Sequence, residues 1–246
     1  MVKSLFIRVF SICIVLLIVL TCTYLFLHSS FFYVDKIRVT GLNTIAESEI
    51  LELSNLHVGK NIFMINTGYC SKSIEVHPLV KEAHIKRHLP REIEISILER
   101  EMWALMPNHD MVLCIDEEGI CLDKLSNRYL PGYPIITMEI MPEKVNIGQA
   151  VSPEGIKMIR AIWDMLTPEI HSQISDYHYL NSSEEVILYT IKGTEVRFGN
   201  LERLEEKTNL MQAVFQVETD IEKKGTEVLE YVDLRFKGQP VIKIRE

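Results

Sequence analysis

Residues Val9–Leu27 read VFSICIVLLIVLTCTYLFL, and this stretch determines how the rest of the chain is organised. None of its 19 residues carries a charge. A helix of that length rises about 28 Å, close to the thickness of a bilayer's hydrocarbon core. Lys3 and Arg8 precede it without any acidic residue, which favours a cytoplasmic N-terminus. The sequence therefore predicts a cytoplasmic tail at residues 1–8 and a transmembrane signal-anchor helix at residues 9–30.

Two other interpretations of Val9–Leu27 fit less well. A cleaved signal peptide has an apolar core of about 7–15 residues and a small-residue cleavage site. Here the run is longer, and Leu27-His28-Ser29 makes a poor cleavage site. A buried core helix would have a polar face, which this stretch lacks. The aromatic cluster at Phe31, Phe32 and Tyr33 suits the outer interface of a membrane.

The composition of the chain limits the possible fold class and partners of the part outside the membrane. The net charge is −8 and 47% of the residues are hydrophobic. This is too apolar for a disordered chain, and the length suffices for two modest domains, which we expect at residues 34–103 and 104–246. The acidic balance and the lack of a basic run argue against nucleic acid as a partner.

Residues 34–103 alternate between strand-like and helix-like patterns over short distances. The clearest strand contains Ile93, Ile95 and Ile97 in alternation with polar residues. The match of Thr44-Ile45-Ala46-Glu47 to a capping box predicts the start of a helix. The pattern predicts, in order, a strand at Lys36–Thr40, a helix after Thr44, a short helix at Tyr69–Glu75, a strand at Ala83–His88 and a strand from Glu92. This order, βααββ, places two helices against a three-stranded sheet.

Residues 104–246 show a different pattern, with more strands and longer helices. Ser152 and Pro153 predict the start of one helix, and Asn200 predicts the start of a second. The expected strands are a hairpin at Val112–Leu122 turning at Asp116–Gly119, then Val186–Ile191, Glu195–Phe198, Val228–Phe236 and Val241–Ile244. The prediction is a mixed or antiparallel sheet with two packed helices, and the fold class of the whole chain is α+β.

Two cysteines flank the expected hairpin. If the turn is centred at Glu117-Glu118, Cys114 faces Cys121 across the strand pair, with Cβ atoms about 4.5–5.5 Å apart. A disulfide is one interpretation of this pair. Two free thiols are the other, and they are favoured because directly opposed strand positions often fit disulfide geometry poorly.

The residue types that bind metals or carry out catalysis form no recognisable pattern. His84 and His88 lie four residues apart, which on a strand separates them by about 13 Å, too far for one ion. On a helix, a zinc-protease motif would need glutamate where Ile85 stands. No Gly-x-Ser-x-Gly elbow and no glycine-rich phosphate loop occurs. We therefore expect no enzyme activity, cofactor, metal site or small-molecule substrate.

Several segments resemble the FtsQ/DivIB family of bacterial cell division proteins. In the first domain they are VDKIRVTG at 34–41, VGKNIF at 58–63, PLVKEAHIKRHLP at 78–90 and IEISILER at 93–100, which look like the FtsQ type of POTRA domain. In the second they are VILY at 186–189, VRFG at 196–199 and YVDLRF at 231–236, which look like the family's β-domain. The resemblance implies a single-pass scaffold at the division septum that helps control septal peptidoglycan synthesis. It implies FtsL-like and FtsB/DivIC-like single-pass proteins as partners.

The end of the chain is the strongest candidate for binding a partner. A terminal strand usually lies at a sheet edge, where its unpaired N–H and C=O groups can pair with another strand. We expect one face of Val228–Ile244 to complete the core at the same time. The resemblance implies a partner contact here, and the residues that we expect to form it are Tyr231, Arg235, Phe236, Gly238, Val241 and Ile244, called the contact set below.

Two alternatives remain open at this point. POTRA modules also guide envelope protein assembly or translocation by strand addition, although such proteins usually carry several modules and a β-barrel. A second surface, formed by His84, Lys86 and His88, could pair with an acidic partner, but charged strand faces are more often simply solvated.

Overall fold

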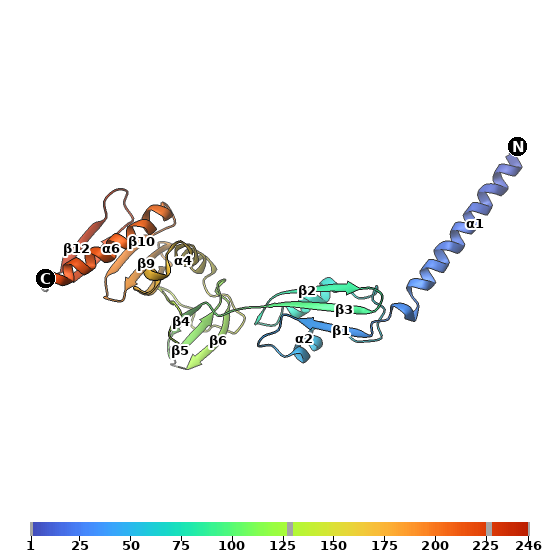
Figure 1. Ribbon diagram of the computed structural model, residues 1–246, viewed down its shortest axis with the longest axis horizontal. Helices are drawn as coiled ribbons and strands as arrows, with labels where there is room; N and C mark the ends of the chain where they lie inside the picture. The colour runs from blue at the N-terminus through green and yellow to red at the C-terminus, as the bar shows by residue number, and fades with distance from the viewer. Residues whose placement is uncertain (1, 127–129, 225–227, 246) are drawn as a thin grey trace. The chain divides into compact units, whose positions relative to one another are not determined.

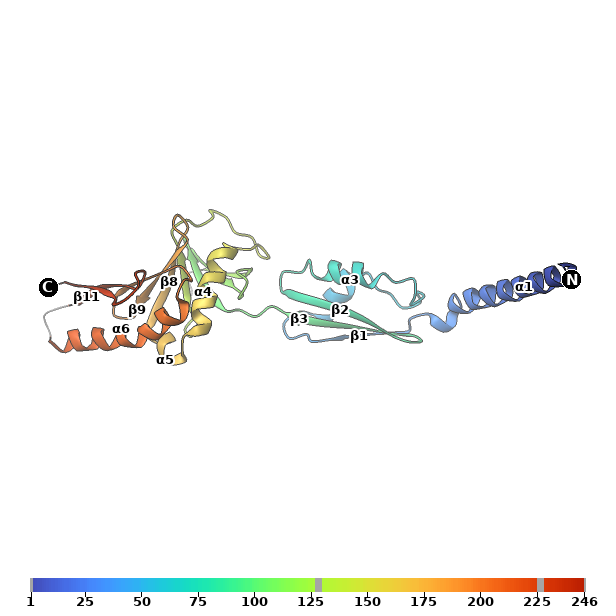
Figure 2. The ribbon, with the colours of Figure 1, turned by 90° about the horizontal axis from the view of Figure 1, so that it is seen from above.

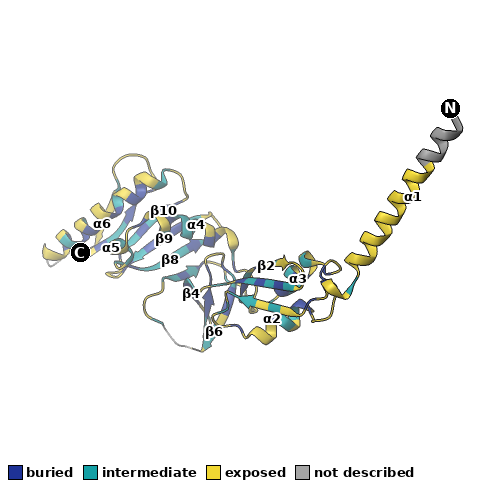
Figure 3. Ribbon diagram, turned by 45° about the vertical axis from the view of Figure 1, so that its right-hand side comes forward, coloured by how far each residue is buried: buried dark blue, intermediate teal, exposed yellow. Residues whose placement is uncertain are grey.

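The computed structural model describes residues 2–126, 130–224 and 228–245, which form two compact units (Figure 1). The first unit is Met1–Arg100 and the second is Glu101–Glu246. Helix α1 (Val2–Leu27) precedes a short 3-10 helix, η1 (Ser30–Phe32). In the described part of the chain, α1 is the one helix whose length and composition suit a membrane span. Its segment Phe10–Leu27 has a mean hydropathy of 2.7 and no buried residue, and it is exposed along its whole length in Figure 3.

A three-stranded sheet and two helices form the rest of the first unit. In chain order they are β1 (Lys36–Thr40), α2 (Glu47–Ser54), α3 (Thr67–Ile74), β2 (Val80–His88) and β3 (Glu92–Glu99). The sheet order is β1-β3-β2, with β3 parallel to β1 and antiparallel to β2. Ile93, Ile95 and Ile97 of β3 are buried, and they pack with Ile50 of α2 and Ile74 of α3. The predicted βααββ order is confirmed.

The start of α2 differs from the expected capping box. The N-cap residue is Ala46, and no side chain caps the helix. Instead, the Glu99 carboxylate at the end of β3 accepts hydrogen bonds from the backbone N–H groups of Asn43, Thr44 and Ile45, at 2.8–3.1 Å. Burial alone would raise the pKa of Glu99, but these hydrogen bonds outweigh it and hold the pKa below its ordinary value.

The second unit is built on one nine-stranded mixed sheet, in the order β12-β11-β10-β9-β8-β7-β4-β5-β6. Three pairs are parallel, β4/β7, β7/β8 and β10/β11, and the other pairs are antiparallel. The strands are β4 (Ala104–Asn108), β5 (Met111–Ile115), β6 (Cys121–Ser126), β7 (Ile135–Met138), β8 (Ile174–Leu180), β9 (Glu185–Thr190), β10 (Glu195–Gly199), β11 (Val228–Asp233) and β12 (Val241–Arg245). The expected hairpin and the later strands are present, and β4, β7 and β8 are additions to the prediction.

Two helices cover one face of this sheet, as Figure 2 shows. They are α4 (Pro153–Met165) and α6 (Leu204–Lys224), and a single-turn helix, α5 (Pro168–His171), follows α4. Ile159 of α4 and Met211 of α6 are fully buried against apolar side chains of the central strands. Ser152 precedes α4 as predicted, but its φ of 44° is left-handed and its side chain makes no cap hydrogen bond.

The hairpin β5–β6 has a different register from the one expected. Cys114 lies opposite Asp123, and Ile115 lies opposite Cys121, because the connection is one residue longer than predicted and the ladder shifts after Cys114. The Asp116 carboxylate stabilises this longer turn by accepting from the N–H groups of Glu118 and Ile120. Cys114 and Cys121 are therefore not directly opposed, and both are buried free thiols whose pKa is raised by burial.

We expect Glu99→Gln to lower the free energy of unfolding of the first unit by about 1–2 kcal/mol at pH 7, because a neutral amide accepts the three N–H groups less strongly. Glu99 has a lowered pKa, so its contribution is present at neutral pH and is lost as the pH falls through that pKa. The difference between wild type and variant should therefore narrow below about pH 4. Urea titrations at several pH values measure it. Glu52→Gln, at an exposed position of α2, is the control. A pH-independent difference would contradict this account.

Candidate partner-binding edge

The two borders of the nine-stranded sheet are β6 and β12, and they differ in how far the chain itself covers them. At β6, the segment 148–151 runs alongside: Gly148 N–H donates to Cys121 O at 2.7 Å, and Cys121 N–H donates to Gln149 O at 2.9 Å. An isolated bridge between Ile120 and Ala150 extends this cover. Within the described ranges, no segment pairs with the outer side of β12. The border at β12 is therefore open to a further strand.

All five residues of β12 are exposed, on both faces of the sheet. Ile242 lies opposite Val232 and Ile244 lies opposite Leu229, so these two isoleucines share the helix-covered face with buried residues of β11. The expectation that one face of the last strand completes the core is wrong for β12. Helix α6 packs against β11, and the core ends there.

Apolar side chains gather at this uncovered border. Phe236, Val241, Ile242 and Ile244 are between 40% and 61% exposed. Burying such side chains is worth about 25 cal/mol per Å² of apolar area, so a partner that covers them gains affinity from each one. The alternation of β12 puts Val241 on one face and Ile242 and Ile244 on the other.

A hollow of about 450 Å³ adjoins the helix-covered face next to this border. It is lined by Val228 and Leu229 of β11, by Ile221 of α6 and by polar residues around them. Glu218 is buried at its wall and accepts hydrogen bonds from the hydroxyl groups of Thr190 and Thr194. Leu229 in the lining of the hollow lies opposite Ile244, but none of the residues that line the hollow belongs to β12.

An ion pair fixes the point where the chain leaves β11. Asp233 is buried, and its carboxylate accepts from the Arg235 guanidinium at 2.7 Å and from the Arg235 backbone N–H at 3.0 Å. A second carboxylate, Glu185, lies 3.2 Å from Arg235. Burial alone would raise the pKa of Asp233, but the hydrogen bonds and charge of Arg235 hold it below its ordinary value. The bonds to Asp233 in turn raise the pKa of Arg235.

Further contacts hold the start of the β11–β12 connection. The Arg203 guanidinium donates to the carbonyl oxygens of Leu234 and Arg235, at 3.1 and 2.9 Å. At Gly199, an added Cβ atom would come within 2.7 Å of the Arg235 side chain. Gly238 has a φ of 107°, which side chains rarely adopt, although the space around it is open. The connection is thus set by backbone conformation as well as by contacts.

The residues of the contact set all lie at or next to the β12 border, but they differ in exposure and in the contacts that they make. Phe236, Val241 and Ile244 present exposed apolar surface, and Gly238 shapes the connection. Tyr231 is half-buried under Arg197, whose guanidinium lies 4.0 Å from the ring centre, and it pairs with Lys243 across the ladder. Arg235 is occupied by Asp233 and Glu185. The contact set omits Ile242, although the alternation of β12 places it beside Ile244.

The histidine surface of the first unit is paired with its own carboxylates. His84 lies 3.2 Å from Glu82, and His88 lies 2.7 Å from Glu94. The first pair lies along β2, an edge strand of the three-stranded sheet, and the second joins β2 to the central strand β3. Among the residues that the structure describes, no group of three histidine, cysteine, aspartate or glutamate side chains is placed to hold a metal ion.

Comparison with known proteins assigns both units. The family model for the FtsQ-type POTRA domain matches residues 32–100, and the model for the C-terminal part of the cell division protein FtsQ/DivIB matches residues 102–235. The second match ends just before the exposed connection and β12.

Individual relatives agree with this assignment. The cell division protein FtsQ of Geotalea daltonii is 23% identical over 87% of this chain and 77% of its own length. The cell division protein DivIB of Clostridium tetani is 25% identical over 94% of this chain and 86% of its own length. A solved structure, the major extracytoplasmic domain of DivIB from Geobacillus stearothermophilus, is 14% identical. It covers 51% of this chain and 96% of that chain with a TM-score of 0.30, too low to add to the family match.

We expect Arg235→Ala to lower the free energy of unfolding of the second unit by about 2–4 kcal/mol at pH 7, because it leaves the buried Asp233 carboxylate without its cation. Asp233 has a lowered pKa in the wild type, so this stabilisation is lost as the pH falls through that value. The loss in the variant should therefore shrink as the pH falls through the lowered pKa of Asp233, below which the carboxyl is protonated in both proteins. Chemical denaturation at neutral and acid pH measures both effects. Lys237→Ala, at the exposed neighbouring position, is the control and should change little. Equal stability of the Arg235 variant and the wild type at pH 7 would refute the role given to this pair.

Proposed function

The chain belongs to the FtsQ/DivIB family of bacterial cell division proteins, and we propose that it acts as a membrane-anchored, non-enzymatic scaffold of the division complex. In this proposal residues 1–8 form the cytoplasmic tail, 9–30 the anchor, 34–103 the POTRA domain and 104–246 the β-domain. The lysine and arginine before the apolar helix support an orientation with both folded domains outside the cytoplasm. The protein would concentrate at the division septum and help control septal peptidoglycan synthesis through the proteins that it binds.

The single observation that carries the proposal is the open border at β12. A sheet edge with unpaired backbone groups binds an extended peptide by adding it as a strand. Here the edge is flanked by exposed apolar side chains that give such a strand something to bury. We therefore propose that a single-pass division protein of the FtsB/DivIC type adds a strand to β12, and that an FtsL-like protein joins the same complex.

Within this proposal the members of the contact set have different roles. Phe236, Val241 and Ile244 supply apolar surface, and Ile242 adds to it on the helix-covered face. Arg235 and Gly238 act as positioning residues, because one neutralises Asp233 and the other permits the turn. Tyr231 supports Lys243 from the neighbouring strand. Loss of binding after a change at Arg235 would thus report a displaced strand rather than a lost contact.

We expect Phe236→Ala and Ile244→Ala each to weaken binding of the partner's extracytoplasmic segment about tenfold, because truncation of an apolar anchor at an interface commonly costs 1–2 kcal/mol. Deletion of residues 238–246 should abolish binding. Titration of purified ectodomain against the labelled partner segment measures the dissociation constants. Ile140→Ala is the matched control, since Ile140 is an exposed isoleucine elsewhere in the same unit. Unchanged affinity for the deletion would reject β12 as the site.

We also expect a fluorescent fusion of the full chain to form a band at the division septum of living cells. The physical basis is that a scaffold follows the partners that its open edge binds. Fluorescence microscopy through the cell cycle measures the distribution. An even signal around the envelope would instead favour the alternative, a POTRA module that guides envelope protein assembly or translocation.

A further inference from the structure

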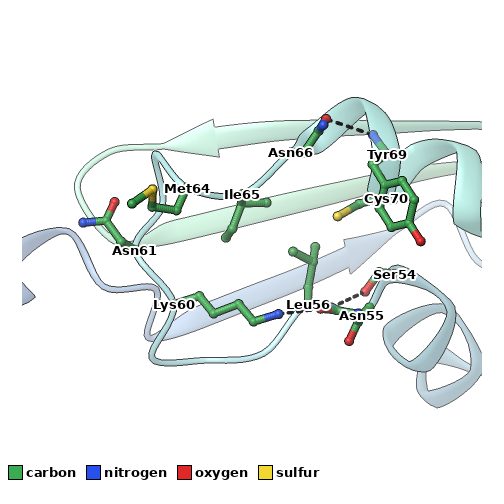
Figure 4. Close-up of a pocket in the computed structure, with 10 residues that line it drawn as sticks. All are labelled: Ser54, Asn55, Leu56, Lys60, Asn61, Met64, Ile65, Asn66, Tyr69 and Cys70. Carbon is green, nitrogen blue, oxygen red and sulfur yellow. Dashed lines mark hydrogen bonds between the residues drawn. The ribbon is translucent and has the colours of Figure 1, made fainter. Parts of the chain in front are cut away.

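A short loop of the first unit turns two apolar side chains into solvent. Phe63 is 44% exposed and Met64 is 69% exposed, whereas their neighbours Ile62 and Ile65 are buried. The loop precedes α3, and Figure 4 shows its residues beside Lys60 and Tyr69. Core packing explains the two isoleucines, but it does not account for the large exposed surface of Phe63 and Met64.

The loop is held rigidly by polar contacts. The Arg87 guanidinium donates to the carbonyl oxygens of Ile62 and Ile65, at 3.0 and 2.6 Å. The Asn66 side chain ends the loop by accepting from the N–H of Tyr69 at the start of α3, at 3.1 Å (Figure 4). Because the loop is already ordered, covering Phe63 and Met64 would cost little conformational entropy.

The same loop is fastened to the segment that follows α1. The N–H of Ile62 donates to Phe32 O at 2.9 Å, and the N–H of Val34 donates to Lys60 O at 2.9 Å. The side-chain amide of Asn61 donates to the carbonyl oxygen of Leu27, the last residue of α1, at 2.7 Å. Two residues of chain span at most about 7 Å, so Phe63 lies close to the end of α1.

Aromatic rings continue from the helix to the loop. Phe32 lies 5.1 Å from Phe26 in the last turn of α1, 5.0 Å from Phe31 and 5.0 Å from Phe63, measured between ring centres. Aromatic side chains are enriched where membrane-spanning helices enter the headgroup layer. That layer is about 5–8 Å deep on each side of the hydrocarbon core. Phe63 is therefore joined to the last turn of α1 through a single ring, that of Phe32.

The turn between β2 and β3 lies next to the segment after α1 and adds to the surface formed by Phe63 and Met64. The Arg91 guanidinium donates to Tyr33 O at 3.1 Å and pairs with the Asp35 carboxylate at 3.2 Å, and Leu89 is exposed in the same turn. Exposed apolar side chains with a nearby cation are typical of surfaces that lie in a membrane interface.

We propose that Phe63 and Met64 insert into the headgroup layer of the bilayer that α1 spans. The occupant is lipid, because the exposed pair is continuous with the aromatic rings of the helix and is bound to its last carbonyl oxygen. The loop is then a second, non-covalent attachment of the first unit to the membrane. It restricts the tilt of that unit, which a single anchor helix would leave free. The inference requires α1 to span a bilayer and is independent of any partner at β12.

The test uses the full chain in vesicles of phosphatidylcholine and phosphatidylglycerol with brominated acyl chains, which quench nearby tryptophan. Met64→Trp places a reporter in the loop. Val76→Trp is the matched control, because Val76 is also exposed but precedes Val80, which pairs with Glu99 at the other end of β3. That end is about 23 Å along the strand from Glu92. The emission of the unsubstituted chain, with its two tryptophans, is subtracted.

We expect the added emission of Met64→Trp to be quenched at least twofold more than that of Val76→Trp and to shift to shorter wavelength. Phe63→Trp should behave in the same way, and circular dichroism checks that each variant folds. Equal quenching at positions 64 and 76 overturns the proposal. So does a shift to shorter wavelength that appears only after division proteins are added and is not accompanied by quenching, since the surface would then bind protein rather than lipid.

Discussion

Backbone hydrogen bonding across the nine-stranded sheet is the constraint on which the second unit depends. Each internal strand has a hydrogen-bonded neighbour on both sides, whereas β6 and β12 have one on one side only. The helices α4 and α6 bury the central strands, and this cover stops at β11. The last strand is therefore held by its ladder to β11 while its side chains stay exposed. The unpaired backbone edge and the exposed apolar side chains therefore both occur at β12, because β12 is the last strand and no helix covers it.

Two carboxylates, those of Glu99 and Asp233, hold irregular segments of the chain in place by accepting hydrogen bonds. Glu99 gathers three backbone N–H groups and so fixes the loop before α2. The Asp233 carboxylate accepts hydrogen bonds from the side chain and from the backbone N–H of Arg235. These bonds fix the conformation of the chain where it leaves β11. In each case the charged acceptor ties a strand end to an irregular segment, where no regular ladder is available.

Much of the fold follows from the sequence, and the reasons for the misses are physical. The alternation at Ile93–Ile97 and the apolar run at Val9–Leu27 are strong local signals, and both elements are present. Strand β8 was missed although Tyr177 and Tyr179 alternate with polar residues, because tyrosine is a weaker core signal than isoleucine and Ser175, Asp176 and His178 make the stretch look like a polar loop. The capping box failed because Glu99, distant in sequence, accepts the N–H of Thr44 that Glu47 would have bound, and the helix begins after Ala46 instead. The open border could be predicted because the last strand of a chain usually lies at a sheet edge. The exposure of Ile242 could not be predicted, because it depends on α6 packing against β11 but not against β12.

The unequal borders of the large sheet limit how many strands it can acquire. The chain's own segment at 148–151 pairs with the start of β6, whereas no described segment pairs with the outer side of β12. A ribbon with two free sides can propagate from molecule to molecule into fibres, whereas one with a single free side saturates after one addition. For the proposed docking at β12, this means that one added strand fills the border, so each copy of the protein would take up one partner strand there.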